Sequence, residues 1–378
     1  METDGLAMFL IVQSHHGERV HGLLKQEKWL DSEVEPLHQE DGSIGFPLLS
    51  TCSPNVLPAW LEARTTIVGV VERHQGRERP SVDPHRRLEK AIETWSNNHA
   101  LELDANALAP QKWEKLGDLA LLPRSPFTSD DWALVRNHDD VESLWKAMAS
   151  ALKVGALGIQ APIADDTYRS SQVEMLLGDS SVVFTDHGMT YTFDAAKVMF
   201  SSGNITERRR IGNLDMRNEV VVDAYAGVGY YTFPMLMHAG AAHVHACEIN
   251  PASLAGLRAG AEANGIVGKM TVHEGDNLAS LAELKGVADR CHLGLLPSSE
   301  KVWEACLLAL KPTGGTLHVH MNVEEERIEA WVEQTVNRFK EMTEAHQLGF
   351  EVRPHHLERV KWFAPRVRHV VLDLSFRL

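Results

Sequence analysis

VVVDAYAGVGYYTFP, residues Val220–Pro234, predicts a buried strand that runs directly into a glycine turn. The three consecutive valines are typical of a parallel strand that is covered on both faces of its sheet. Asp223 lies where this strand ends, and Gly227 and Gly229 then permit a tight backbone turn that a nucleoside can approach closely. The order of strand, acid and glycine turn therefore predicts a ligand site at the end of a strand.

Two later segments end in an acid in the same way. Residues 242–248 (AHVHACE) end in Glu248, whose carboxylate can accept both hydroxyl protons of a ribose. Residues 270–276 (MTVHEGD) end in Asp276, which could face an adenine amino group. Because the carboxyl ends of parallel strands meet at one edge of a doubly wound α/β sheet, these two acids and Asp223 predict a nucleoside-binding crevice at that edge.

The glycine spacing favours S-adenosylmethionine (SAM) over a nicotinamide dinucleotide. A dinucleotide site needs a third glycine, and this chain has Thr232 in that place. An acid directly before the turn would repel a pyrophosphate, whereas it suits the ammonium group of a methionine moiety. The D-x-x-A-G-x-G pattern, joined to Glu248-Ile-Asn-Pro251 and Gly275-Asp-Asn277, therefore predicts SAM as the ligand. The alternative is an ordinary strand, turn and helix with no ligand.

Length and composition set the broad class of protein. The chain has 378 residues, of which 44% are hydrophobic and 24% charged, as is typical of a soluble globular protein of two or three domains. No apolar run is long enough to cross a membrane and the start is acidic, so we expect a cytoplasmic protein with no membrane partner. We expect no metal either, because the four cysteines form no close pair and the histidines at 318, 320, 355, 356 and 369 lack an ordered ligand spacing.

The formal net charge of −15 argues against a general nucleic-acid binder. It does not exclude a binder whose basic residues are concentrated in one place. Arginines gather in a predicted loop between Glu72 and Arg87 and in the run Arg208–Arg210, and we expect those of the loop to contact nucleic-acid phosphate. The alternative is a solvated face. The arginines of the loop are Arg73, Arg77, Arg79, Arg86 and Arg87.

We expect three domains, namely an N-terminal α/β domain of residues 1–98, a smaller middle α+β domain of residues 99–200, and a SAM-binding domain of residues 201–378. Hydrophobic periodicity predicts the main elements of the last two domains. These elements are one strand over Trp113–Pro123, a helix over Val141–Leu152, a hairpin of strands 181–185 and 189–193, later strands over 289–296, 315–322 and 367–376, and an acidic helix over 324–347.

Five motifs carry a resemblance to a known family. They are Trp113–Pro123, Arg169–Gly178, KVMFSSGNITERRRI (Lys197–Ile211), DRCHLGLLPSSE (Asp289–Glu300) and LHVHMNV (Leu317–Val323). From about Trp113 to the carboxyl end, the chain resembles the tRNA wybutosine-synthesizing protein 2 family. The resemblance implies a class I SAM-dependent, Rossmann-like fold.

The resemblance also implies an activity. Members of that family transfer the 3-amino-3-carboxypropyl group of SAM to a carbon of the tricyclic guanine-derived base on the 3′ side of the anticodon in phenylalanine tRNA, and they release methylthioadenosine. We therefore expect an enzyme of wybutosine biosynthesis that uses SAM as a co-substrate. Its expected partner is the anticodon region of tRNA-Phe, with a possible further tRNA contact in residues 1–98, and a monomer is favoured.

The site residues follow by position from the same resemblance. Arg208 stands where the family usually has lysine; it can still pair with the methionine carboxylate, and no other partner is expected for it. Arg169 and Pro297 are the expected substrate contacts. The expected SAM contacts are Ser201, Arg208, Asp223, Gly227, Gly229, Glu248, Asp276 and Asn277.

Glu207 is the expected general base. The attacked ring carbon carries a proton that must leave, and related methyltransferases place an acid at this position. The alternative interpretation is that Glu207 only forms an ion pair with Arg209 or Arg210.

Two other functions remain open from the sequence. The closer one is a tRNA guanine N1-methyltransferase of the same fold. Such enzymes carry an asparagine directly before Leu-Pro in the fourth strand, whereas Gly294-Leu-Leu-Pro297 has no amide, which favours aminocarboxypropyl transfer. The other is a SAM-sensing or RNA-binding scaffold without turnover. The complete set of Asp223, Glu248 and Asp276 argues against a scaffold.

Overall fold

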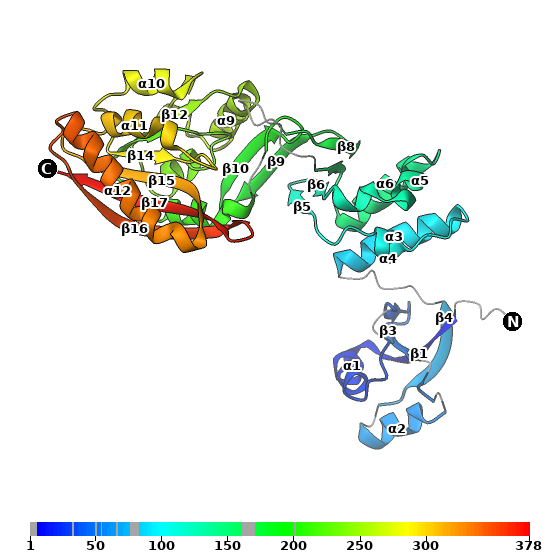
Figure 1. Cartoon of the computed structure of the whole chain (residues 1–378). Coiled ribbons are helices and arrows are strands. Elements are labelled where there is room, and N and C mark those ends of the chain that lie inside the picture. Colours follow the sequence, from blue (N-terminus) through cyan, green and yellow to red (C-terminus); the bar gives the residue numbers. More distant parts are fainter. Residues whose placement is uncertain are drawn as a thin grey trace. The chain divides into compact units, whose positions relative to one another are not determined.

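The computed structural model describes residues 6–31, 34–49, 51–53, 55–65, 67–75, 83–160, 171–199 and 202–378 (Figure 1). The chain forms two compact units, Met1–Lys90 and Ala91–Leu378. The finer division at residues 98 and 200 stays a prediction. Within the described ranges, no helix is both long and apolar enough to span a bilayer.

The first unit is a four-stranded sheet with helices packed on it. The strand order is β2-β3-β1-β4, and β1 (Leu6–Gln13) pairs antiparallel with both β3 (Ser43–Leu48) and β4 (Val70–Gln75). The short strand β2 comprises Leu37–His38. Helices α1 (Gly17–Gln26) and α2 (Leu57–Arg64) complete the unit. Its core contains Leu10, Val12, Val20, Leu24, Phe46, Leu57 and Leu61.

The predicted loop from Glu72 to Arg87 is wrong at both ends. Strand β4 continues to Gln75, so Arg73 is a strand residue. Helix α3 (Pro84–Asn98) begins with a proline, which suits the first helical turn because its missing N–H has no partner to lose there. Arg86 and Arg87 are therefore helical, and Arg77 and Arg79 lie outside the described residues.

The second unit opens with a small α+β region. Its sheet has the order β5-β6-β7-β8. The single strand predicted over Trp113–Pro123 is wrong, because Gly117 adopts a φ of +60° and turns the chain into two antiparallel strands, β5 (Glu114–Leu116) and β6 (Leu119–Leu122). The helix predicted over Val141–Leu152 is confirmed as α6. The remaining elements are α4 (Ala105–Leu108), α5 (Asp130–Arg136), β7 (Ala156–Ile159) and β8 (Glu174–Leu177).

The predicted hairpin is confirmed as β9 (Ser181–Asp186) and β10 (Met189–Asp194). Alternate residues of β10 are buried, and the strand packs against helix α9 (Pro251–Ala263). Gly256 permits this contact, since a Cβ there would lie 2.6 Å from a backbone oxygen of Thr192.

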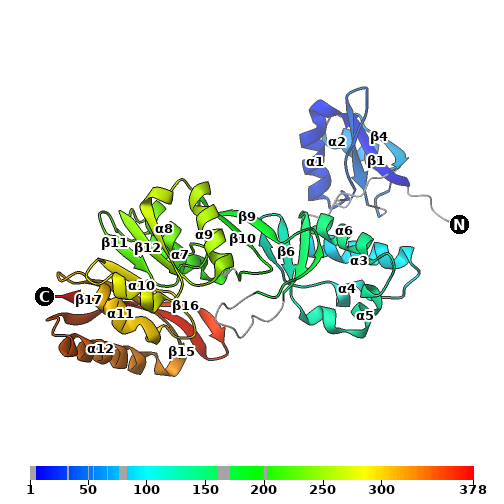
Figure 2. The same cartoon turned by 90° about the horizontal axis from the view of Figure 1, so that it is seen from above.

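A seven-stranded sheet forms the largest part of the second unit (Figures 1 and 2). Its order is β13-β12-β11-β14-β15-β17-β16, with the first five strands parallel and β17 and β16 antiparallel. The order reverses between β11 and β14, which opens a crevice at their carboxyl ends. The strands are β11 (Val220–Asp223), β12 (His243–Glu248), β13 (Met270–Glu274), β14 (Arg290–Leu293), β15 (Gly315–Glu324), β16 (Glu351–Ala364) and β17 (Val367–Arg377).

Helices cover both faces of this sheet, so the predicted doubly wound fold is confirmed. One face carries α7 (Ile205–Gly212), α8 (Thr232–Met237) and α9, and the other carries α10 (Asn277–Glu283), α11 (Trp303–Ala309) and α12 (Ile328–Ala345). The predicted acidic helix over 324–347 corresponds to α12. Strand β16 was not predicted, because Pro354 and three register irregularities break its pattern.

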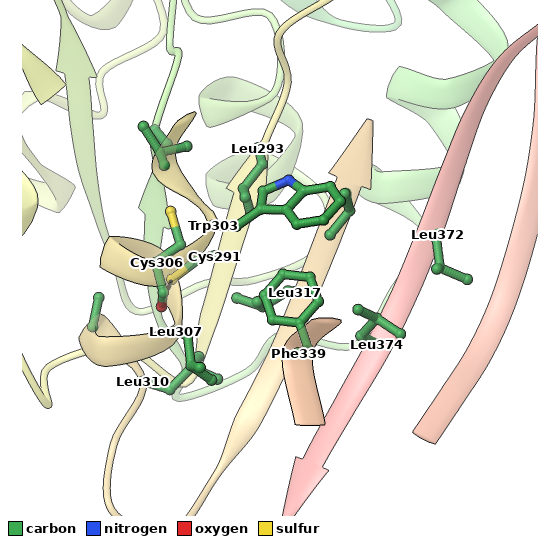
Figure 3. Close-up of a cluster of buried hydrophobic side chains, with 14 of the residues drawn as sticks. Cys291, Leu293, Trp303, Cys306, Leu307, Leu310, Leu317, Phe339, Leu372 and Leu374 are labelled. Atoms are coloured by element: carbon green, nitrogen blue, oxygen red, sulfur yellow. Dashed lines mark hydrogen bonds between the residues drawn. The ribbon is translucent and has the colours of Figure 1, made fainter. Parts of the chain in front are cut away.

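The core beneath α11 and α12 is apolar (Figure 3). Trp303 stacks on Phe339 with ring centroids 5.1 Å apart. Leucines of β14, β15 and β17 and the thiols of Cys291 and Cys306 fill the space around this pair. The opposite face, beneath α7, instead buries charged and polar side chains, among them Glu207, His318 and Asp373.

Candidate active site at the carboxyl edge of the sheet

The glycine turn after β11 is as tight as the sequence predicts. Gly227 and Gly229 have φ values of +55° and +97°, a region that side chains with a Cβ rarely adopt. A Cβ on either glycine would lie 2.4 Å from an aromatic ring, that of Tyr230 or of Phe233 respectively. The turn therefore has no room for larger residues.

Asp223 is fully buried at the end of β11 and holds the start of α8. Thr232 donates its hydroxyl to Asp223 Oδ2 over 2.8 Å, and the backbone N–H of Tyr225 points to Oδ1 at 3.4 Å. This contact accounts for a threonine where a dinucleotide site has its third glycine. That Asp223 binds the ammonium group of SAM stays a prediction.

Glu248 is bonded to the turn itself. Its Oε2 accepts the N–H of Gly227 at 2.7 Å, and its Oε1 accepts those of Ile249 and Asn250 at 2.9 and 2.7 Å. Burial raises the pKa of Glu248, against the effect of these three donors. A carboxylate has about four lone-pair sites. Three are occupied here, so Glu248 can accept one ribose hydroxyl without releasing a backbone N–H, not two.

We expect Glu248→Ala to weaken SAM binding by about 1.5–3 kcal/mol, because the ribose loses a charge-assisted hydrogen bond and three turn N–H groups lose their acceptor. Isothermal titration calorimetry measures this change. Glu274 is a matched control, since it pairs with Glu248 in the strand register but is exposed and bound to Arg258. An equal loss in Glu274→Ala would contradict the assignment.

Asp276 and Asn277 lie at the next strand end. Asp276 is exposed and accepts the N–H of Leu278 at 2.8 Å, which caps α10. Asn277 donates its amide to the carbonyl of Ala224 at 3.0 Å and so ties this strand end to the glycine turn. Their contacts with SAM stay predictions.

The structure does not test three other predicted contacts, those of Ser201, Arg169 and Pro297. Ser201 and Arg169 lie outside the described residues. Pro297 is exposed and follows a cis peptide bond, and the backbone N–H of Asn322 donates to its carbonyl at 2.9 Å. Its contact with substrate stays a prediction.

Arg208 already has a carboxylate partner within the protein. Its side chain is 2% exposed and donates to Asp186 at the end of β9 over 3.0 Å. The expectation that Arg208 has no protein partner is therefore wrong. Arg208 belongs to helix α7 and Asp186 to strand β9, so only the tertiary structure brings them together. That Arg208 also binds the methionine arm stays a prediction.

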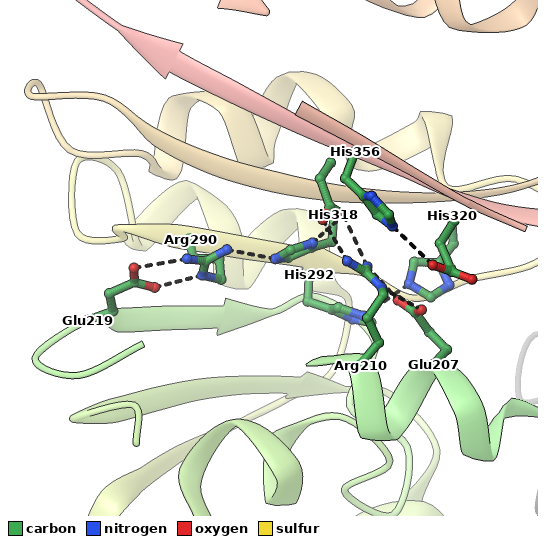
Figure 4. A network of polar contacts seen from close by, with 10 residues as sticks. Glu207, Arg210, Glu219, Arg290, His292, His318, His320 and His356 are labelled. Carbon is green, nitrogen blue, oxygen red and sulfur yellow. Dashed lines mark hydrogen bonds and ion pairs between the residues drawn. The ribbon is translucent and has the colours of Figure 1, made fainter. Parts of the chain in front are cut away.

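Glu207 lies on the buried side of α7, and it shares an arginine with a second acid (Figure 4). Arg210 donates to both oxygens of Glu207 at 2.8 Å, and on its other side to both oxygens of Asp373 at 2.7 and 3.1 Å. Two carboxylates thus face one guanidinium. The ion pair with Arg210 is the one that the alternative interpretation of Glu207 requires, and the role of base stays a prediction.

The network continues from Asp373 to the far edge of the sheet (Figure 4). His318 donates Nδ1–H to Asp373 at 2.6 Å, and its Nε2 accepts from Arg290 at 2.9 Å. Because arginine can only donate, this contact requires a lone pair on Nε2 and hence a neutral His318. Burial lowers the pKa of His318 to about 4, in agreement with that tautomer. Arg290 then pairs with Glu219 over 2.6 and 2.9 Å.

The environments of the two acids determine which of them takes up a proton first. Burial raises the pKa of Glu207 against the effect of Arg210. Burial acts in the same direction on Asp373, but His318 and Arg210 outweigh it and lower the pKa of that acid. A proton that reaches this cluster therefore goes to Glu207 and not to Asp373.

Three further histidines form a chain across β14, β15 and β17. His292 and His320 face each other through their Nε2 atoms at 3.0 Å, and His320 Nδ1 lies 3.0 Å from His369 Nε2. Asp223 lies 3.7 Å from His292 Nδ1 and favours a proton there. If His292 carries its proton on Nδ1, both His320 and His369 must carry theirs on Nε2. A proton on His292 Nδ1 would thereby determine the tautomers on three strands.

Two of the buried histidines, His318 and His369, should make the stability of the protein sensitive to acid. Burial lowers the pKa of His318 to about 4 and that of His369 to about 3, while the unfolded groups titrate near 6.5. Below pH 6.5 the unfolded chain therefore binds protons that the folded chain does not. The free energy of unfolding should fall as the pH drops from 7 to 5. Urea titrations at both pH values measure this fall. The free energy of unfolding should decrease less for His369→Asn than for the unaltered protein, and by the same amount for the exposed His356→Asn.

Sequence reasoning missed this polar layer. It considered the histidines only as possible metal ligands, but His318, His320 and His369 are all buried on one face. The available signal was the H-x-H spacing at 318 and 320, which places both rings on the same side of a strand. Within the described ranges, no group of three or more His, Cys, Asp and Glu residues is arranged to hold a metal.

Comparison with known proteins gives the family. Residues 182–352 match the TRM5/TYW2 methyltransferase domain, and residues 98–181 match the TYW2 N-terminal domain. The tRNA wybutosine-synthesizing protein 2 homolog of Danio rerio is 34% identical, over 97% of this chain and 98% of its own length. The chain belongs to the tRNA wybutosine-synthesizing protein 2 family. The resemblance predicted from the motifs is thereby confirmed.

Other relatives extend this family assignment. A tRNA wybutosine-synthesizing protein 2/3/4 of Arabidopsis thaliana is 39% identical over 78% of this chain, which spans 29% of that longer protein. The TYW2 structure of P. horikoshii in complex with MeSAdo is 26% identical with a TM-score of 0.61, over 76% of this chain and 99% of that one. The TYW2 structure of M. jannaschii in complex with AdoMet is 26% identical with a TM-score of 0.54, over 70% and 99%.

Proposed function

We propose that this chain transfers the 3-amino-3-carboxypropyl group of SAM to the tricyclic guanine-derived base 3′ of the anticodon in tRNA-Phe, and releases methylthioadenosine. One observation carries the proposal: the strand ends with Asp223, Glu248 and Asp276 surround one glycine turn, in a chain 34% identical from end to end to a wybutosine-synthesizing protein 2 homolog. The AdoMet and MeSAdo complexes of the archaeal relatives support SAM as the co-substrate.

The crevice fits SAM by its own geometry. Only backbone lies at the positive-φ positions of the turn, so an adenosyl group can come close to Gly227. Glu248 keeps one acceptor site for a ribose hydroxyl, and Asp276 is exposed beside the end of β13 for the adenine amino group. SAM supplies an electrophilic carbon on its sulfonium. The residues of the crevice supply position, which accounts for most of the rate in such transfers.

Glu207 serves as the acceptor of the substrate proton in this proposal. Its raised pKa suits a group that takes up one proton per turnover, and Arg210 remains beside it to stabilise the ionised form afterwards. Arg208, held by Asp186, orients the methionine arm so that a carbon other than the methyl faces the base.

The closest alternative is a guanine N1-methyltransferase. The absence of an amide in Gly294-Leu-Leu-Pro297 favours aminocarboxypropyl transfer, as does the match to the TYW2 N-terminal domain. We further propose that the protein is cytoplasmic, in keeping with four cysteines that are all free thiols. We also propose that it is a monomer. Arg73, Arg86 and Arg87 remain candidates for a tRNA contact of the first hundred residues.

One experiment tests the proposed reaction against its alternative. The protein is incubated with labelled SAM and tRNA-Phe that carries the tricyclic precursor, and in parallel with tRNA-Phe that carries guanine at that position. Mass spectrometry of the nucleoside by-product should find methylthioadenosine with the first substrate alone. S-adenosylhomocysteine with the second substrate would establish the methyltransferase, and no by-product with either would favour a scaffold.

A further inference from the structure

The turn of the β16–β17 hairpin lies at the same sheet edge as the crevice. Strand β17 runs antiparallel to β15, and its first residue, Val367, pairs with Glu324 at the carboxyl end of β15. Ala364 closes the turn by pairing with Val367 from the other strand. The hairpin therefore projects from the carboxyl edge of the sheet, the edge at which β11 and β12 end with Asp223 and Glu248.

Two aromatic side chains are exposed at this tip. Trp362 and Phe363 are each 53% exposed, and they are the only aromatic residues among the exposed large hydrophobic side chains in the described part of the chain. The strand register is irregular between Trp362 and Ala364, and both rings lie on the surface. Exposed aromatic rings are unfavourable in water, so two adjacent ones indicate a binding surface.

Basic residues flank these rings in the sequence, and Arg368 contacts one of them. The ten residues from Arg359 to Arg368 (RVKWFAPRVR) include four basic residues and no acid, on a chain whose net charge is −15. Arg368 lies under Trp362, with its guanidinium carbon 3.6 Å from the ring centroid, and is fixed by Glu325 at 2.7 Å. Arg366 is exposed at the turn itself. An anionic partner with flat apolar faces matches this combination.

We propose that the tip, defined as Arg359–Arg368, docks unpaired nucleotides of the substrate RNA loop. Trp362 and Phe363 stack on bases that neighbour the modified one, and Arg366 contacts phosphate. RNA loops offer splayed bases for such stacking, and a base that enters the crevice must first leave its own stack. This inference rests on the proposed function, since it takes the substrate to be an RNA loop.

The test separates RNA binding from catalysis. Equilibrium binding of tRNA-Phe and of a short anticodon stem–loop RNA is measured with Trp362→Ala, Phe363→Ala and the double variant, and SAM affinity is measured alongside. Stacking contacts of this kind predict a loss of about 5- to 150-fold in RNA affinity per ring, with SAM affinity unchanged. Trp362→Phe should retain most of the affinity. Arg366→Ala should reduce the slope of log affinity for RNA against log salt concentration by about 0.7.

Matched controls come from the same strand and from another exposed apolar site. Arg353→Ala alters an exposed arginine at the far end of β16, and Val267→Ala trims a side chain that is 56% exposed. Neither should change RNA affinity. RNA affinity of the double variant equal to that of the unaltered protein overturns the docking site, even if methylthioadenosine is still produced. Lost RNA binding in a protein that yields no by-product would uphold the site and refute the proposed reaction.

Discussion

Glu207→Gln should lower the rate of group transfer by about 10²–10⁴-fold, because the amide cannot take up the proton that leaves the substrate carbon. The affinity for SAM should stay the same, since Glu207 faces Arg210 and not the glycine turn. Single-turnover measurements with saturating SAM give the chemical step directly. Unchanged transfer would leave Glu207 as an ion-pair partner of Arg210 and nothing more.

Glu219→Gln is the matched control for this substitution. Glu219 is the carboxylate at the other end of the same network, bound to Arg290 and remote from the crevice. It should have little effect on the rate. Asp373→Asn offers a second check, because Asp373 raises the pKa of Glu207 and its removal should shift the acidic limb of the pH–rate profile to lower pH.

Arg210→Ala should destabilise the protein by about 3–5 kcal/mol at pH 7, because it leaves two buried carboxylates without their counter-charge. Glu207 and Asp373 are 1% and 3% exposed, so water cannot replace the guanidinium without opening the structure. Urea denaturation measures the difference. The loss should shrink on mild acidification, since protonation of Glu207 removes one of the two charges.

Arg209→Ala provides the comparison for this prediction. Arg209 is the adjacent arginine of α7 but is exposed, and an exposed substitution of this kind changes stability by about 0.5 kcal/mol or less. Equal stabilities of the two variants would mean that the buried cluster contributes nothing to folding. A marked loss confined to Arg210→Ala would establish that the buried contacts of Arg210 stabilise the fold.

Local pattern was sufficient for the part of the site that is built from one stretch of chain. The valine run, Asp223 and the two glycines determine a strand and a turn through residues that are close in sequence. Hydrophobic periodicity likewise predicts α6 and the hairpin of β9 and β10, because each buries one regular face. The edge acids follow from the rule that parallel strands end together.

The partners of the charged residues were decided by tertiary structure. Arg208 meets Asp186 and Arg210 meets Asp373 across 22 and 163 residues of sequence, and nothing in the local pattern distinguishes one arginine of the run from the next. Periodicity reports which face of an element is apolar, but not which other element it meets. A long-range ion pair depends on where two separate strands and a helix come to lie, and that is fixed only when the whole sheet is assembled.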